Sequence, residues 1–283
     1  MNAEELYTQL EKDFITSEMS DSWEDNMQDL AEFLSDNYKK RSMGLVCDNS
    51  RQISKVYTAV FPSKQVMLSI LDRDESNIML FVHHPVDWDM GKAPHVEQQM
   101  DRDLLLQFRE RGISIYNLHV PLDNYGEYST SVSLARALGV EIQKPFGYYF
   151  GALCGVFGKT IYSTIQELGE KFKSVLGHRT SLYQYGNDEI KDRMVAITAG
   201  GGNMVSVLEE IAVEGVNTFI TGISIRNEVS ELSHKYAEDN RINILGGTHY
   251  STEKPACLAI CRYFERLGLP AEFIEGVPSL EDL

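Results

Sequence analysis

The chain has 283 residues, of which 43% are hydrophobic and 24% are charged, and its formal net charge is −16. This balance is typical of a folded protein with a sizeable core, and it argues against a disordered or fibrous chain. A surface this acidic repels nucleic acid phosphates and anionic lipid, so we expect neither nucleic acid nor a membrane as a direct partner.

The amino-terminal segment and the cysteines indicate the cellular compartment of the protein. Residues 1–14 are acidic and amphipathic, without the basic start or the apolar centre of a signal peptide. The chain has no C-x-x-C pair, which argues against zinc ribbons and thioredoxin-type redox motifs. Buried thiols in a reducing cytoplasm are the simplest interpretation of its four cysteines, Cys47, Cys154, Cys257 and Cys261. We therefore expect a cytoplasmic protein.

Hydrophobic periodicity predicts strands and helices in alternation along most of the chain. In the first half, we predict helices at residues 3–14, 29–38, 64–71 (capped by Ser63), 96–111 and 131–138, and strands at 56–61, 78–82 and 113–118. In the second half, we predict helices at residues 165–176, 204–213, 228–237 and 253–267, and strands at 194–198, 218–220, 242–245 and 271–274. Residues 141–158 are harder to assign, and we expect an extended strand with a glycine-rich turn.

This alternation indicates βαβ units, so we predict an α/β fold with mainly parallel sheets. A polar, turn-rich stretch at residues 123–131 is the best candidate for a boundary. We place an amino-terminal α/β lobe at residues 1–128 and a carboxy-terminal α/β lobe at residues 129–283. The two lobes are expected to pack against each other.

Histidines follow three of the predicted strands directly or within a few residues. His83 and His84 come after strand 78–82, His119 after strand 113–118 and His249 after strand 242–245. Ligands of parallel sheets bind outside the carboxyl ends of the strands, so we expect these side chains to converge. Carboxylates lie within a few residues of each of them, at Asp87, Asp89, Asp123 and Glu253.

The spacing of these residues favours a metal site, although a single histidine at a strand end is more often a hydrogen-bonded structural residue. Adjacent His83 and His84 suit two ions rather than one, because two rings just past a strand can occupy neighbouring positions. Four-residue spacing joins His119 to Asp123 and His249 to Glu253. Mixed imidazole and carboxylate donors suit Zn, Fe(II), Mn(II) or Co more than Ca or Mg.

Two further stretches have weaker signals. Gly200, Gly201 and Gly202 join a strand to a helix, where backbone N–H groups can hold a phosphate, but a tightly packed turn is the more common reason for such glycines. The aromatic residues at 146–150 can stack on a nucleobase, but they fit a core or a subunit interface better. No G-x-S-x-G motif is present, so a serine hydrolase lacks its usual sign.

Around these histidines, the sequence resembles a known family, the dinuclear-metal-centre hexameric proteins. Its members are also described as type 2 GTP cyclohydrolase I and as relatives of a yeast interacting factor. The matching pieces follow the family's order over most of the chain beyond Gly44: FVHHPVDW, HVPLDN, SLARALGV, AITAGGGNM, FITG and GGTHYSTEKPA. The His-His-Pro piece and the late G-x-H-x-x-x-E piece are specific in combination, whereas neither is specific alone.

The resemblance implies a toroidal homohexamer in which each chain has two interleaved α/β lobes with a two-metal site between them. It implies two divalent transition-metal ions per chain, such as Zn, Fe or Mn. The implied metal ligands are His83, His84, Asp123, His249 and Glu253, with Glu253 as the candidate carboxylate shared by both ions. His119 matches a neighbouring position and is implied to contact the ligands or the substrate.

The sequence also departs from the family's pattern near the expected pocket. Ile223 stands where an acidic residue usually follows a Thr-Gly pair, and Phe61 lies where the family often has Leu-Asp. Asparagine is common in the family where Ser129 or Ser131 stands here. None of these departures removes a metal ligand, but they affect the substrate pocket.

These observations favour a metal-dependent hydrolase acting on a small molecule. A hydroxide bridging two ions would attack carbon or phosphorus, with His119 as a general acid or base. The resemblance suggests a nucleotide such as GTP as substrate. Two alternatives stay open: a non-catalytic metal-binding scaffold or regulatory protein partner, and a nucleotide-binding module that uses the glycine turn without metal. Asp87 and Asp89 are expected to be solvated carboxylates outside the metal site.

Overall fold

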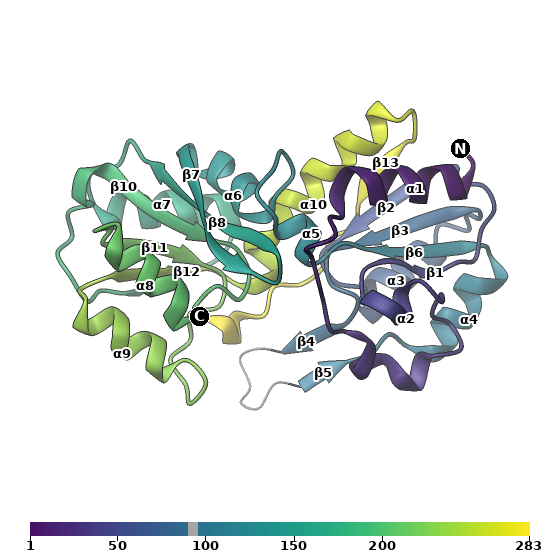
Figure 1. The fold of residues 1–283 in the computed structure, drawn as a ribbon, viewed down its shortest axis with the longest axis horizontal. Helices are drawn as coiled ribbons and strands as arrows, with labels where there is room; N and C mark the ends of the chain where they lie inside the picture. The colour runs from purple at the N-terminus through teal and green to yellow at the C-terminus, as the bar shows by residue number, and fades with distance from the viewer. Residues whose placement is uncertain (90–95) are drawn as a thin grey trace.

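The chain folds into two mixed β-sheets with helices on their faces, one sheet on each side of the view in Figure 1. The computed structural model describes residues 1–89 and 96–283. Sequence analysis therefore predicts the α/β class correctly, whereas only the first sheet has mainly parallel strands. In the described residues, no helix is both long enough and apolar enough to cross a membrane.

The first sheet has five strands in the order β1-β6-β3-β2-β13. Only the β1–β6 pairing is antiparallel. The strands are β1 (Gly44–Cys47), β6 (Ile113–Asn117), β3 (Ile78–Val82), β2 (Val56–Ala59) and β13 (Ala271–Phe273).

Strand β3 explains how this sheet is covered on both faces. Successive residues of a strand point to opposite faces, so an unbroken apolar run requires a core on each side. Leu80 and Val82 join the cluster that contains α3 (Lys64–Leu71) and α4 (Arg102–Glu110). Met79 and Phe81 join the cluster that contains α1 (Ala3–Phe14) and α10 (His249–Arg266).

The second sheet has six strands in the order β7-β8-β10-β11-β12-β9, and only β10–β11 and β11–β12 are parallel. Its strands are β7 (Glu141–Tyr149), β8 (Ala152–Lys159), β10 (Met194–Thr198), β11 (Thr218–Thr221), β12 (Asn243–Gly246) and β9 (Ser181–Tyr183). One face packs on α6 (Thr130–Leu138) and α7 (Ile165–Leu176), the other on α8 (Val205–Val213) and α9 (Glu231–Asp239). The antiparallel β7–β8 hairpin and edge strand β9 make this sheet mixed.

Helix α10 and strand β13 return the chain to the first sheet. In Figure 1, α10 runs behind the junction of the two sheets, and β13 then pairs with β2. Helix α10 also packs against α6, which covers the second sheet. A division into lobes at residue 128 stays a prediction. The remaining short elements are η1 (Glu24–Leu30), α2 (Tyr38–Arg41), β4 (Asp87–Asp89), β5 (Val96–Gln98), α5 (Val120–Asp123), η2 (Lys191–Arg193) and η3 (Leu280–Asp282).

Two helices predicted in the first half of the chain are wrong in extent. A continuous helix at 29–38 does not form, because the backbone N–H of Ser35 donates to the Val46 carbonyl of strand β1. The helix predicted at 96–111 starts only at Arg102, because the Asp101 side chain caps it by accepting from the N–H groups of Asp103 and Leu104. Strand β5 precedes that cap.

Candidate metal centre

The ends of β3 and β6 bring the first histidines into the interior. Beyond the end of β3 at Val82, the backbone N–H groups of His83 and His84 donate to the carbonyls of Ala59 and Val60. Both imidazoles are almost completely buried. The side chain of Asn117, the last residue of β6, donates to the His83 carbonyl and ties the two strand ends together.

His83 is oriented as a ligand whose second nitrogen faces two carboxylates. Its Nδ1 lies 2.9 Å from the Leu118 carbonyl, which can only accept, so Nδ1 carries the proton. Its Nε2 lies 3.3 Å from Glu253 Oε1 and 3.5 Å from Asp123 Oδ1, and it has no hydrogen-bond partner among the described residues. Burial lowers the pKa of His83, but Glu253 and Asp123 outweigh it and raise this pKa to about 9.

Helix α10 supplies His249 and Glu253, which lie one turn apart on the same face. The Thr248 side chain caps the helix by accepting from the Ser251 N–H, so the helix starts four residues earlier than the sequence predicts. Glu253 Oε1 lies 3.0 Å from His249 Nε2, and Oε2 lies 3.0 Å from His84 Nε2. The two oxygens of one buried carboxylate therefore face different histidines.

The charges within this cluster depend on one another. Burial opposes ionisation of Glu253, but His249, His84 and His83 outweigh it and hold the Glu253 pKa well below its usual range. Burial, with the neighbouring His83 and His119, lowers the pKa of His84 well below its usual value, although Glu253 opposes this shift. Burial raises the pKa of Asp123. Here the protons on the histidines balance the negative charge of the buried carboxylates. A divalent cation placed among these donors would supply that positive charge instead.

Asp123 and His119 lie at the two ends of the short helix α5. Asp123 Oδ1 accepts a 2.6 Å hydrogen bond from Thr130 Oγ1. His119 Nδ1 lies 2.9 Å from Asp21 Oδ2, while His119 Nε2 points toward the cluster, 3.8 Å from Asp123 Oδ2. Burial opposes protonation of His119, but Asp21 outweighs it and raises the His119 pKa. Sequence analysis did not identify Asp21, which is 98 residues away from His119 in the chain.

The structure brings together the five predicted metal ligands and His119. Three overlapping groups have donor atoms within 4.8 Å of one another: His83, His84 and His119; His84, His249 and Glu253; and His83, Asp123 and Glu253. Buried His, Glu and Asp groups at these distances could hold metal ions. Asp87 was predicted to lie outside the metal site, and it lies on β4 and lines a different cavity. The Asp89 side chain lies outside the described residues.

The glycine turn fits closely around Glu253. Gly200 has a φ of +68°, and a Cβ at this position would lie 2.1 Å from Glu253 Oε1, so only glycine leaves room for the carboxylate. Its N–H donates to Thr252 Oγ1 at 3.0 Å, and its carbonyl accepts from the N–H groups of Gly222 and Ile223. The Gly200 backbone is therefore engaged within the protein. Phosphate binding at Gly201 and Gly202 stays a prediction.

A cavity of about 140 Å³ opens beside the cluster. Gly201 and Gly202 line it together with His84, His119, Asp123, His249 and Glu253. The β7–β8 hairpin adds Tyr149 and Cys154, which sequence analysis did not assign to the site. The Tyr149 ring centroid lies 6.2 Å from that of His119, and burial raises the pKa of Tyr149.

The residues that depart from the family's pattern lie against this site. Phe61 stacks on His84 with ring centroids 4.8 Å apart, and its ring meets His249 edge-on at 5.3 Å. The Phe61 ring therefore covers one side of the histidine cluster. Ser129 Oγ donates to the Asp123 carbonyl, and Ser131 Oγ accepts from the Ala199 N–H. Ile223 is buried, and its N–H donates to the Gly200 carbonyl of the glycine turn.

Comparisons with known proteins identify relatives that cover most of this chain. A relative from Pyrococcus horikoshii is 29% identical over 249 residues, which cover 85% of this chain and 92% of the relative. One from Escherichia coli is 26% identical over 239 residues, or 82% of this chain and 88% of the relative. Both are described as "GTP cyclohydrolase 1 type 2 homolog".

Two solved structures show the same fold at low sequence identity. Protein ybgI superimposes with a TM-score of 0.76 at 22% identity, covering 99% of this chain and 100% of that one. TTHA1606 from Thermus thermophilus gives 0.69 at 21% identity with the same coverage. Residues 23–277 match the family described as Duf34/NIF3 (NGG1p interacting factor 3). Because that match spans most of the sequence, the chain belongs to the DUF34/NIF3 family.

Proposed function

We propose that the protein is a metal-dependent hydrolase with two divalent transition-metal ions held by His83, His84, Asp123, His249 and Glu253. The observation that supports this most directly is the position of Glu253, whose two oxygens lie 3.0 Å from His249 and His84 respectively. A carboxylate in this position can bridge two ions. The imidazole-rich donor set suits Zn, Fe or Mn.

The chain's own residues prepare the site for such ions. The Leu118 carbonyl fixes the proton of His83 on Nδ1, which leaves Nε2 directed at Glu253 and Asp123. Gly200 leaves the space that the Glu253 carboxylate occupies. When bound, a pair of divalent ions supplies Lewis acidity, which lowers the pKa of a water molecule and offsets negative charge in the transition state.

His119 is the residue we propose for proton transfer. Asp21 holds its Nδ1, so Nε2 faces the cavity side of the cluster, near Asp123. An imidazole oriented by a carboxylate through one nitrogen can take or give a proton through the other. His119 Nε2 would accept a proton from the attacking water and return it to the leaving group.

For the substrate, we propose a small molecule with a carbon or phosphorus electrophile, with a nucleotide such as GTP as the first example to test. The names of the relatives support the nucleotide. The cavity of about 140 Å³ is smaller than the roughly 300–1,000 Å³ of typical ligand pockets, so only the reacting part of a nucleotide would enter it. We also propose the homohexamer, which light scattering of the purified protein would test.

A second candidate function is a non-catalytic metal-binding scaffold or regulatory partner. The burial of the donors and the small cavity favour this alternative, because a structural site is closed by protein whereas a catalytic one keeps an open position. In this case, the metal would stabilise the junction between α10 and the first sheet.

Metal content and turnover together distinguish these functions. We would load the full-length protein separately with Zn, Fe(II) and Mn(II), measure ions per chain by plasma mass spectrometry, and assay GTP and a panel of phosphate and amide substrates. About two ions per chain with turnover that a chelator abolishes supports the hydrolase. A similar metal content without turnover of any substrate supports the scaffold, and no bound ion contradicts both.

A further inference from the structure

A separate cavity lies on the face of α10 opposite the metal centre. At about 100° per residue, His249 and Glu253 lie on one face of this helix, whereas Ser251, Leu258 and Arg262 lie on the other. Helices α6 and α7 complete this groove, which has a volume of about 440 Å³. That volume is within the range of small-molecule sites.

The charge of the groove is unusual for this chain. Its lining includes three cationic side chains, Arg136, Lys254 and Arg262, and no carboxylate, in a protein with 42 acidic and 26 basic residues. Lys254 Nζ lies 2.7 Å from Glu275 Oε1, whereas Arg136 donates to a backbone carbonyl. Among the residues that the structure describes, neither Arg136 nor Arg262 forms an ion pair. The groove therefore has a positive local charge.

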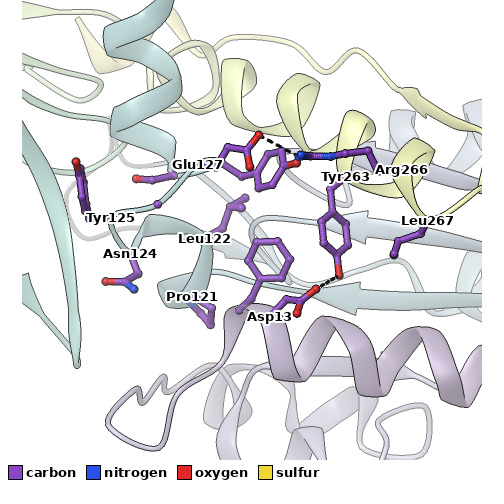
Figure 2. A pocket seen from close by; sticks show the side chains of 13 residues that line it. Asp13, Pro121, Leu122, Asn124, Tyr125, Glu127, Tyr263, Arg266 and Leu267 are labelled. Atoms are coloured by element: carbon purple, nitrogen blue, oxygen red, sulfur yellow. Dashed lines mark hydrogen bonds and ion pairs between the residues drawn. The ribbon is translucent and has the colours of Figure 1, made fainter. Parts of the chain in front are cut away.

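Another cavity against the same helix has the opposite balance. It lies between α1 and the end of α10 and has a volume of about 460 Å³. Figure 2 shows Arg266 paired there with Glu127 at 3.0 Å, and Asp13 accepting from the Tyr263 hydroxyl. In that cavity, Glu127 thus neutralises Arg266, and the Asp13 carboxylate remains as an additional negative charge. The surplus of unpaired guanidinium groups distinguishes the groove on the opposite face.

Two further features of the groove point to a ligand. Ser133 lines it and is only 6% exposed as a residue, and in the described part of the chain its Oγ has no hydrogen-bond partner. A buried hydroxyl without a partner is costly, and a bound acceptor would satisfy it. The rest of the lining is largely apolar and includes Leu176 and Leu258, the latter 45% exposed. An apolar surface beside cations suits an amphipathic anion.

We propose that this groove binds a small organic anion with an apolar body. Arg136, Arg262 and the Ser133 hydroxyl hold its carboxylate or phosphate, and its apolar part lies on Leu176 and Leu258. The site is independent of the proposed hydrolase activity, since it uses none of the metal donors. Because Lys254 adjoins Glu253 in α10, the ligand binds on the reverse side of the helix that supplies the metal centre.

Calorimetric titration of the full-length protein tests the proposal with four probes: octanoate, octyl phosphate, octan-1-ol and inorganic phosphate. We expect at least one of the two amphipathic anions to bind saturably, at one per chain, and octanol and inorganic phosphate to bind at least about tenfold more weakly. The tighter of the two anions identifies the head group. If neither anion saturates, or if octanol binds as tightly as they do, the proposal is wrong.

Two arginine variants locate the binding. Arg262→Ala should weaken the anion about tenfold, whereas Arg266→Ala, on the same helix but in the other cavity, should leave its affinity unchanged. Ser133→Ala should weaken it less, and the metal content of all three variants should equal that of the wild type. Equal affinity of Arg262→Ala and wild type contradicts the proposal. So does a change of oligomeric state in Arg262→Ala without anion binding to the wild type, which would identify the groove as an interface between copies.

Discussion

The two sheets contribute to the metal centre in different ways. Parallel pairing of β3 with β6 in the first sheet sets two strand ends side by side, and the residues that follow supply His83, His84, His119 and Asp123. The second sheet leads to the other two donors and leaves the space that one of them occupies. Its strand β10 ends in the glycine turn, and β12 leads into the helix that carries His249 and Glu253.

The two regions therefore differ in what fixes the donors in place. The first sheet positions rings whose nitrogens are held by main-chain and side-chain partners, such as the Leu118 carbonyl and Asp21. In the second, the absence of a side chain at Gly200 lets Glu253 approach. Substitution of a donor should therefore remove a ligand, whereas substitution in the glycine turn should displace a donor by steric contact.

The largest effect is expected from Glu253→Ala, because this carboxylate contacts His83, His84 and His249. We expect metal affinity to fall more than about 100-fold, beyond the roughly 10- to 100-fold effect of residues that only support ligands. Plasma mass spectrometry measures the ions retained. Asp87→Ala is the control and should keep the wild-type content, since Asp87 lines another cavity. A wild-type metal content in Glu253→Ala would exclude Glu253 as a ligand.

His119→Asn tests whether this residue transfers protons or binds metal. With His119 as an acid–base group, turnover should fall by about 10²- to 10⁴-fold while the metal content stays constant. Asp21→Asn should produce a smaller decrease, because it loosens the ring without removing it. Loss of an ion from His119→Asn would instead assign His119 to the ligand group that it forms with His83 and His84.

Metal binding should strengthen with rising pH. The pKa of His83 is about 9 without metal, so at neutral pH a metal ion must displace a proton from it. Apparent affinity should rise about tenfold per pH unit between about pH 7 and 9, as measured by competition with a chelator. His178 lies against the Ser251 hydroxyl and belongs to none of the three donor groups, so His178→Ala should show the same slope. A flat profile would mean that the ion does not displace this proton.

Stability of the metal-free protein should change in the opposite direction. The folded pKa of His83 lies above its ordinary value of 6.5, so its contacts with Glu253 and Asp123 stabilise the fold fully below pH 6.5. That contribution disappears as the pH rises through about 9. Urea denaturation with and without metal, at a pH below the ordinary pKa and at one near the folded pKa, would reveal the two opposite trends.

The smallest effect is expected from Gly200→Ala, which removes no donor. Its positive φ and the 2.1 Å approach to Glu253 should cost about 1–3 kcal/mol of stability and weaken metal binding. Gly201→Ala is a matched control, because its Cβ would meet nothing closer than 3.7 Å. Thermal denaturation with and without metal measures both. Equal behaviour of the two variants would contradict the close fit around Glu253.

The sequence predicts the α/β class and the convergence of donors because both depend on strand ends. A short, unbroken apolar run such as 78–82 fits few structures other than a buried strand. The residues that follow it must then lie at the carboxyl end of the sheet, where ligands bind. Asp21 and Tyr149 could not be assigned in this way, because a loop and a hairpin bring them to the cavity through tertiary packing. The start of α4 had a local signal in the sequence, because Asp101 is a typical helix-capping residue. The hydrophobic periodicity extended the predicted helix beyond this cap.

The parallel pairing of β13 with β2 has a consequence for biosynthesis. Thr58 pairs with Phe273, which is far away in the sequence, so β2 remains an edge strand of the first sheet until the ribosome has made β13. An exposed edge strand is a template for pairing with other chains. We therefore expect truncated chains that end before β13 to aggregate through β2 rather than to form a stable half-molecule.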